Sequence, residues 1–272
     1  MGQGREGRQR EDRIVSTSHR DATALTDALV AARLHHARLT AGDWQQALHD
    51  AGDAYAVQDA VAAALGWFGN AAPPYWKSGG PSLAALTHAP LPPDAVRTSP
   101  ASFAELPLHA PGIESEIALR LAVDIDAARA AQLSMNDVER IVDAMTVSIE
   151  VVDSRWREGM QGAPALLRLA DLASHAALAL GAWVPFARRP WSAQRCETRI
   201  GAQPVHVHTG SHSLGDPAAV LPQWLQHATR GGATLPAGTV VTTGSWVGAL
   251  PAQRGDDVVV TFDGIGSASL RL

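Results

Sequence analysis

The sequence contains very little cysteine or lysine. Its 272 residues include one cysteine, Cys196, which excludes a disulfide within the chain and a cysteine-based zinc cluster and is typical of a reducing compartment such as the cytoplasm. Of its 22 basic residues, 21 are arginine and one is lysine, Lys77. Because a desolvated ammonium can release its proton whereas a guanidinium keeps it, Lys77 is a candidate for proton transfer.

Long apolar runs and basic stripes are also missing. No window reaches about 18 consecutive apolar residues, the length that crosses a bilayer, and the formal net charge is -5 without basic residues interleaved with aromatics. We therefore expect neither a membrane nor a nucleic-acid partner. The 46% of hydrophobic residues can bury a substantial core. Residues 1–20 carry mixed charge without apolar periodicity and predict a disordered tail before a single catalytic domain over 21–272.

The N-terminal part of that domain reads as helical. Apolar residues recur at helical spacing within residues 22–48 and again within 53–65, which predicts a helical part over 21–70 followed by a catalytic part over 71–272. Residues 78–110 are rich in proline, serine and glycine without periodicity. They predict a long loop, a kind of segment that is often functional.

Later segments alternate between strand and helix patterns. Period-2 alternation over 113–120 predicts a strand. A helix capped by Ser134 or Asn136 is expected to run through Met145. Further strands are expected over 147–152, 178–183, 240–243, 258–262 and 268–272, with a helix over 218–230. The fold class is therefore mixed α/β, with a strand-rich C-terminal half.

Three of the nine glutamates lie in these strands. Glu114 and Glu116 share one strand face, and Glu150 stands among valines and an isoleucine. Buried carboxylates need a cation, and three of them without a histidine or cysteine partner suit a hard ion such as Mg²⁺ or Mn²⁺ that keeps positions open for water and substrate. The alternative is a solvated strand face that carries ordinary glutamates.

Four stretches carry a resemblance to a known family. They are DAYAVQDAV at 53–61, IESEIALRL at 113–121, IEVVDSRW at 149–156 and the segment from TTGSW to the final strand at 242–272. Together they make the chain similar to the 2-keto-4-pentenoate hydratase and 4-oxalocrotonate decarboxylase branch of the fumarylacetoacetate hydrolase superfamily. The family's run after its lysine is replaced here by Gly79-Gly80-Pro81, which implies a diverged substrate loop in which Asp94 is a candidate acidic residue.

The resemblance implies a catalytic fold of that superfamily with a defined centre. It assigns the metal to Glu114, Glu116 and Glu150, and acid/base catalysis to Lys77 in the WK-x-G context at 76–79. It further implies a short 2-oxo or 2-hydroxydienoic acid as substrate and a homo-oligomer as the assembly. The TGS loop makes Gly244 and Ser245 candidate substrate ligands, with a plain turn between strands as the alternative.

Other polar residues each allow a functional and a structural interpretation. Arg155 either binds substrate or forms an internal ion pair with Asp153. The histidines at 206, 208 and 212 could form a metal cluster but are better explained as part of an exposed strand. The run from Gly244 to Gly248 resembles a nucleophile elbow, yet its serine stands one place early, which argues against a serine hydrolase.

Three classes of function fit this sequence. The first is a hydratase that adds water to a 2-hydroxy-2,4-dienoate to give a 4-hydroxy-2-oxo acid in the catabolism of aromatic compounds. The second is a metal-dependent carbon–carbon lyase, such as a 4-oxalocrotonate-type decarboxylase or a hydrolase of acylpyruvates. The resemblance implies that a hydrolase would carry a His-Glu dyad on a short helix just after the strand of Glu114 and Glu116, and residues 124–133 contain neither histidine nor glutamate, which disfavours hydrolysis. The third is a non-catalytic partner subunit, which a missing metal ligand would have favoured.

Overall fold

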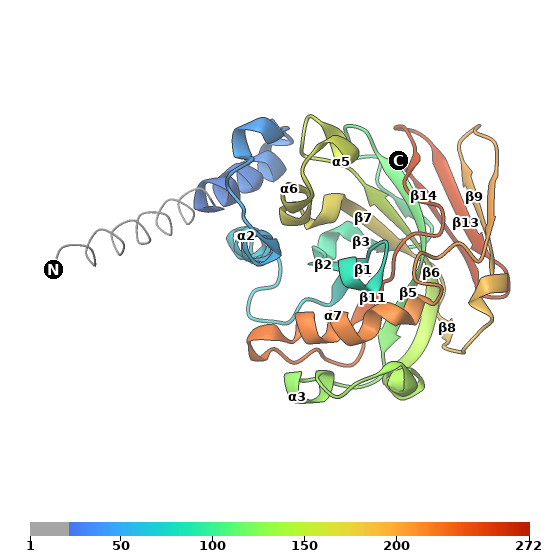
Figure 1. Ribbon diagram of the computed structural model, residues 1–272. Helices are drawn as coiled ribbons and strands as arrows, with labels where there is room; N and C mark the ends of the chain where they lie inside the picture. Colours follow the sequence, from blue (N-terminus) through green and yellow to red (C-terminus); the bar gives the residue numbers. More distant parts are fainter. Residues whose placement is uncertain (1–21) are drawn as a thin grey trace, which may run out of the picture. The chain divides into compact units, whose positions relative to one another are not determined.

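The protein is described by a computed structural model over residues 22–272, and the tail predicted for residues 1–20 lies outside the described residues. The described chain divides into two compact units. The helical unit comprises residues 22–67 together with Ser154–Ser174, and the sheet unit comprises Phe68–Asp153 and His175–Leu272 (Figure 1). The segment 154–174 belongs to the unit of the N-terminal helices, an association that local spacing in the sequence did not predict.

The helical unit contains the two helices that apolar spacing predicts. The first is shorter than expected, because it covers residues 22–35 and ends where His36 takes a left-handed φ of 54°. The remaining elements are η1 (Ala41–Trp44), α2 (Ala51–Ala64), α5 (Gly159–Gly162), α6 (Ala165–Ala170) and η5 (Leu172–Ser174). Their core gathers Leu29, Val57 and Trp156, each at most 2% exposed.

The sheet unit is built from two sheets. In the larger one the strand order is β2-β1-β11-β5-β6-β7-β3, with β12 paired to β5 and β8 to β6. In the smaller one the order is β10-β9-β13-β14-β4. The strands of the larger sheet are β1 (Tyr75–Gly79), β2 (Thr87–Pro90), β3 (Val96–Thr98), β5 (Gly112–Leu121), β6 (Val142–Val152), β7 (His175–Leu180), β8 (Val184–Pro185), β11 (Val240–Thr242) and β12 (Leu250–Pro251). Those of the smaller sheet are β4 (Ala101–Ser102), β9 (Arg195–Ile200), β10 (His206–Thr209), β13 (Asp257–Phe262) and β14 (Gly266–Arg271).

One face of the larger sheet forms the main core. Apolar residues of β5 and β6, such as Ile117 and Ile149, share a cluster with Val260 and Phe262 of the smaller sheet. A hydrogen bond of 2.6 Å between the hydroxyls of Ser115 and Thr198 joins the two sheets inside this core. Because side chains alternate along a strand, the residues between these apolar ones face the other way. That opposite face carries the carboxylates described below.

Short helices connect and cover the strands. They are η2 (Leu83–Ala85), η3 (Pro93–Ala95), α3 (Ala127–Ala130), η4 (Met135–Asp137), α4 (Val138–Ile141), η6 (Trp191–Ala193), η7 (Pro217–Val220), α7 (Leu221–Ala228) and η8 (Arg230–Gly232). The helix predicted for 218–230 is realised as η7 and α7. Trp224 of α7 packs edge-to-face on Trp76 of β1, with 6.4 Å between the ring centres. Within residues 22–272, none of the helices combines the length and apolar character needed to cross a membrane.

Two sequence-based expectations are wrong in this unit. The segment 78–110 is not one loop, because it holds β2, β3 and β4, which pair with β1, β7 and β14. Strands of two to four residues are too short to show periodicity. Remote partners stabilise β3 and β4, and the preceding strand stabilises β2. The helix expected through Met145 ends at Ile141, although Ser134 does cap its first turn in a capping box. Val142 to Thr146 instead extend β6, whose two faces are both buried and so lack alternation.

Candidate metal centre

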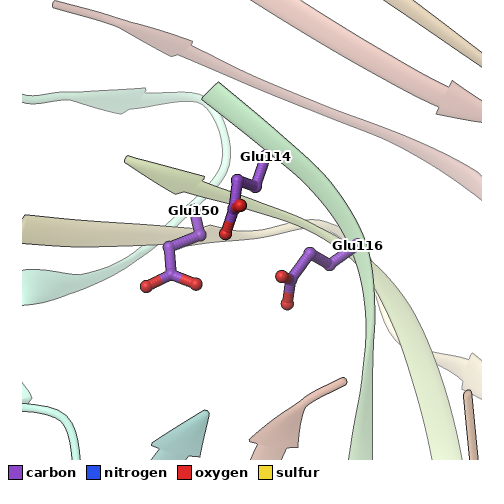
Figure 2. Close-up of side chains that lie close together, drawn as sticks. All are labelled: Glu114, Glu116 and Glu150. Carbon is purple, nitrogen blue, oxygen red and sulfur yellow. The ribbon is translucent and has the colours of Figure 1, made fainter. Parts of the chain in front are cut away.

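Three carboxylates meet on the second face of the larger sheet. Antiparallel pairing places Glu114 of β5 directly opposite Glu150 of β6, and Glu116 lies two residues further along the same face. One ligand oxygen from each of the three lies within 4.8 Å of the other two (Figure 2). In the described part of the chain, this is the only group of three or more histidine, cysteine, aspartate or glutamate side chains arranged to hold a metal ion. The structure therefore brings together the glutamates that the sequence singled out.

Lys77 reaches the same centre from β1. Its strand lies beside β11, so that Lys77 is paired with Thr242, and the side chain extends to Glu150. The ammonium Nζ donates to Glu150 Oε1 at 2.6 Å. The candidate acid/base residue is thus held against one of the candidate metal ligands.

Two further residues complete the centre, and sequence reasoning did not identify either of them. His175, the first residue of β7, places Nδ1 2.9 Å from Glu150 Oε1. Thr242 of β11 donates its hydroxyl to Glu116 Oε2 and is itself bonded to the hydroxyl of Ser148 at 2.8 Å. Thr242 belongs to the TTGSW stretch and could have been proposed from its neighbours, whereas nothing in the sequence distinguishes His175.

Burial and mutual repulsion shift the carboxyl groups. Burial, together with the charge of Glu150, raises the pKa of Glu114 to about 7, although Lys77 opposes this. Burial, with Glu150 and Glu114, raises the pKa of Glu116 to about 8. Glu150 is different because Lys77 and His175 outweigh its burial and hold its pKa below the ordinary value. The three carboxylates therefore strongly favour a nearby positive charge.

The pKa of Lys77 is raised in the metal-free chain, whereas the lowered pKa expected from sequence applies to a lysine beside a bound cation. A desolvated lysine near a cation is expected to have a lowered pKa. Burial alone would lower the pKa of Lys77, but the charges of Glu150, Glu114 and Glu116 together outweigh burial and raise this pKa. The side chain is accordingly held as an ammonium, because three carboxylates surround it and one of them accepts its hydrogen bond.

The donor set fits a hard divalent cation. All three groups offer carboxylate oxygens, the ligands that Mg²⁺ and Mn²⁺ prefer. Glu150 Oε2 is buried and has no hydrogen-bond partner, which is costly for a carboxylate oxygen unless another group binds it. Three carboxylates against one ammonium leave a net negative charge that a divalent ion would offset.

The TGS loop forms a turn that follows β11. Ser245 donates its hydroxyl to the carbonyl of Gly248 at 2.9 Å and accepts from the amide of Val247. Gly244 has a φ of +99°, and a Cβ added to it would lie 3.5 Å from the Cα of Gly79. Both residues therefore have a structural role in this turn, and substrate binding by them stays a prediction.

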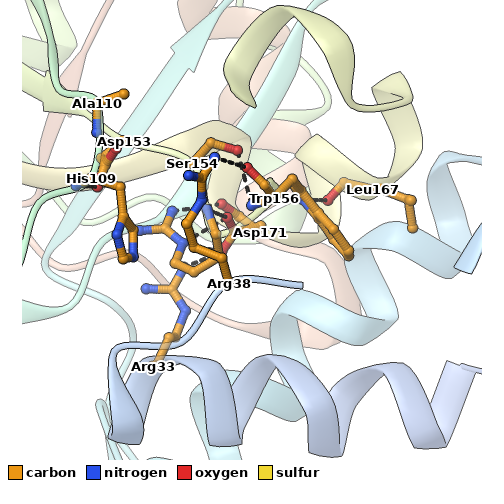
Figure 3. A network of polar contacts seen from close by, with 10 residues as sticks. Arg33, Arg38, His109, Ala110, Asp153, Ser154, Trp156, Leu167 and Asp171 are labelled. Carbon is orange, nitrogen blue, oxygen red and sulfur yellow. Dashed lines mark hydrogen bonds and ion pairs between the residues drawn. The ribbon is translucent and has the colours of Figure 1, made fainter. Parts of the chain in front are cut away.

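Arg155 belongs to the helical unit and is held by an ion pair there. Its Nε lies 2.7 Å from both oxygens of Asp171. The same carboxylate binds Arg33 at 2.8 Å, and Figure 3 labels both of these residues. Asp153, the other member of the ion pair considered from sequence, accepts backbone amides of His109 and Ala110 in the sheet unit. The structural role of Arg155 is thus accounted for by Asp171.

The histidines at 206, 208 and 212 do not form a metal cluster in the described residues. His206 and His208 lie half-buried on β10, in line with the strand interpretation. His212 is buried, and its Nε2 lies 2.9 Å from the carbonyl oxygen of Thr243. Asp94, the candidate acidic residue of the diverged loop, is exposed on η3.

We predict that the metal-free protein loses stability as pH rises from about 6.5, the ordinary histidine pKa, to about 8, the pKa of Glu116. The folded-state pKa values of Glu114 and Glu116 exceed the ordinary 4.5, so the folded chain retains protons that the unfolded chain has released in this window. The free energy of unfolding must then fall with pH. The raised pKa of Lys77 and the lowered pKa of Glu150 affect stability outside this window. Below about 6.5 the stability changes in the opposite direction, because burial lowers the pKa of three histidines that the unfolded chain protonates there: His88, His212 and His227.

Thermal unfolding of chelator-treated protein at several pH values measures how the free energy of unfolding changes with pH. Mg²⁺ or Mn²⁺ should raise the melting temperature, and more strongly at the alkaline end, because the cation replaces the protons. Substituting glutamine for both Glu114 and Glu116 should flatten the pH dependence. An unchanged slope in that double variant, with no stabilisation by either ion in the wild type, would favour the solvated-face interpretation.

Comparison with known proteins supports this description of the fold. The family described as Fumarylacetoacetate (FAA) hydrolase C-terminal matches residues 75–272, which include every residue of the centre. A sequence comparison with curated proteins finds no match.

Several solved structures share the fold. 4-Oxalocrotonate decarboxylase from Pseudomonas putida G7, complexed with magnesium and adipate, matches with a TM-score of 0.79 and 22% identity over 93% of this chain and 97% of that one. 2-Hydroxyhepta-2,4-diene-1,7-dioate isomerase from Mycobacterium marinum matches with a TM-score of 0.53 and 18% identity over 74% of each chain. Fumarylpyruvate hydrolase from Pseudomonas aeruginosa, in complex with Mn²⁺ and pyruvate, matches with a TM-score of 0.50 and 14% identity over 72% of this chain and 88% of that one.

Proposed function

Because the chain belongs to the fumarylacetoacetate hydrolase C-terminal family, we propose that it is a divalent-metal-dependent lyase that removes CO₂ from a short, unsaturated 2-oxo dicarboxylic acid of the 4-oxalocrotonate type. The observation that carries the proposal is the ammonium of Lys77, held 2.6 Å from Glu150 beside two further carboxylates. The match to a decarboxylase over 93% of the chain supports it, since the isomerase and hydrolase cover 74% and 72%.

Glu114, Glu116 and Glu150 would hold the cation. Their carboxylate oxygens converge, and Glu150 Oε2 is available because its hydrogen bonds are made through Oε1. Thr242 fixes the carboxylate of Glu116 by donating to Oε2. When bound, a divalent cation supplies Lewis-acid stabilisation of negative charge on the oxygens of a 2-oxo acid.

Lys77 would act on the carbon chain of the substrate. In the proposed reaction the bond to the departing carboxylate breaks, CO₂ leaves, and the electron pair moves through the conjugated chain to give a dienolate. The ammonium of Lys77 favours this step by its positive charge and then donates a proton from Nζ to the dienolate. An ammonium that donates to Glu150 at 2.6 Å suits this role, because the reaction requires a proton donor and no base to activate water.

The test is a side-by-side assay of two substrates. Protein loaded with Mg²⁺ or Mn²⁺ receives 4-oxalocrotonate in one reaction and 2-hydroxypenta-2,4-dienoate in the other, while CO₂ release and dienoate absorbance are followed. We expect CO₂ from the first substrate and no enzymatic loss of the second. Hydration of the dienoate without CO₂ release would contradict decarboxylation and restore the hydratase interpretation, and inactivity toward both would favour a non-catalytic subunit.

A further inference from the structure

We infer that His175 is a positioning residue for the centre, one that holds the Glu150 carboxylate so that Oε2 faces the cation. The inference rests on the proposed metal site and goes beyond it, because it assigns a role to a residue that is not among the three carboxylates or Lys77. His175 is 1% exposed, and it contacts Glu150 through Nδ1 at 2.9 Å.

A β-bulge brings His175 onto the carboxylate face. Leu178 lies opposite Glu150 in the β6–β7 ladder, so simple alternation would place Ala176 on that face and turn His175 toward the main core. The register shifts between Val151 and Val152, however, and pairs Val152 with His175. Since Val152 and Glu150 share a face, the bulge re-aims the imidazole toward the carboxylate, as bulges near functional sites often do.

The contacts of Glu150 divide between its two oxygens. Oε1 receives both Lys77 Nζ and His175 Nδ1, whereas Oε2 is buried without a hydrogen-bond partner. A carboxylate only accepts hydrogen bonds, so Nδ1 must carry the proton in this contact. Two donors from different strands fix the carboxylate more firmly than Lys77 alone, whose flexible stem would allow it to rotate and offer Oε2 to the ammonium.

Removing the donor should therefore weaken metal binding. Loss of a residue that orients a metal ligand typically lowers metal affinity by about 10–100-fold. We expect a loss of that size in His175→Leu, which keeps an apolar side chain of moderate volume but no donor. His175→Asn, whose side-chain amide can donate from a position near Nδ1, should retain most of the affinity.

Calorimetric titration of the full chain with Mn²⁺ alone makes the comparison. His227→Leu is the control, because it removes a half-buried imidazole on α7, where the ring packs against Trp76 with a distance of 6.1 Å between ring centres. That control should bind Mn²⁺ as the wild type does. Thermal unfolding of each metal-free variant reports whether it is folded.

The outcomes separate the inference from the proposed function. Equal Mn²⁺ affinity in wild type and His175→Leu overturns the positioning role alone, whereas a wild type that binds no Mn²⁺ overturns the proposed function and this role with it. If His175→Leu does not fold, nitrogen-15 spectra of histidine-labelled wild type test the inference instead, by showing which ring nitrogen of His175 carries the proton. The His175 signal is the one that disappears in His175→Asn. The inference requires a protonated Nδ1, and a neutral ring protonated only at Nε2 contradicts it.

Discussion

Glu150→Gln is expected to lower the affinity for Mg²⁺ or Mn²⁺ by more than about 100-fold, beyond the loss typical of a residue that only orients a ligand. The substitution removes one of three anionic ligands while leaving the shape of the side chain nearly unchanged. It also removes the charge that holds the Lys77 ammonium, which then remains beside Glu114 and Glu116 and opposes a second cation there. Calorimetric titration of the chelator-treated variant measures the loss.

A surface glutamate provides the control for this variant. Glu139→Gln makes the same chemical change at a side chain that is 60% exposed and pairs with Arg188 at 3.5 Å. Its metal affinity should equal that of the wild type. If Glu150→Gln bound the ion as tightly as Glu139→Gln, Glu150 would not be a ligand.

Lys77→Arg is expected to fold and to bind metal but to lose turnover by about 10² or more, the usual contribution of a general acid/base. Arginine keeps the positive charge beside Glu150, so the electrostatic balance of the centre is largely preserved. It cannot donate its proton at an accessible pH, because the pKa of a guanidinium is too high. The measurement is the turnover number on the better of the two assay substrates, alongside Mn²⁺ titration.

The absence of other lysines gives this variant an independent check. Because Lys77 is the sole lysine among 272 residues, an amine-selective reagent can modify one side chain only, apart from the chain's amino terminus. Modification at Lys77, located by mass spectrometry, should inactivate the wild type. Near-wild-type turnover by Lys77→Arg would make Lys77 a structural residue and would require another proton donor.

The carboxylate centre was predictable because it depends on local alternation and on residue type. Glu114, Glu116 and Glu150 stand out in strands that are otherwise apolar, and the period of two fixes the face on which each lies. That they meet depends on the pairing of β5 with β6, which the sequence did not specify but which neighbouring strands in a chain often adopt.

The rest of the centre depends on long-range geometry. His175 reaches Glu150 because a register shift reverses its side-chain direction, and no pattern in the sequence marks that shift. The strands β3 and β4 exist because distant partners supply their hydrogen bonds. The ion pair of Arg155 with Asp171 likewise depends on a turn 16 residues downstream. These features follow from tertiary packing, which local spacing does not encode.

The account depends above all on a cation held by three glutamates. Diffraction data from crystals grown with Mn²⁺ and measured at the manganese absorption edge test it most directly. We expect one anomalous peak per chain within coordination distance of Glu114, Glu116 and Glu150, with Glu150 Oε2 as a ligand and Oε1 still bonded to Lys77 and His175. A carboxylate cluster without a peak, or a peak bound only by other residues, would contradict the account.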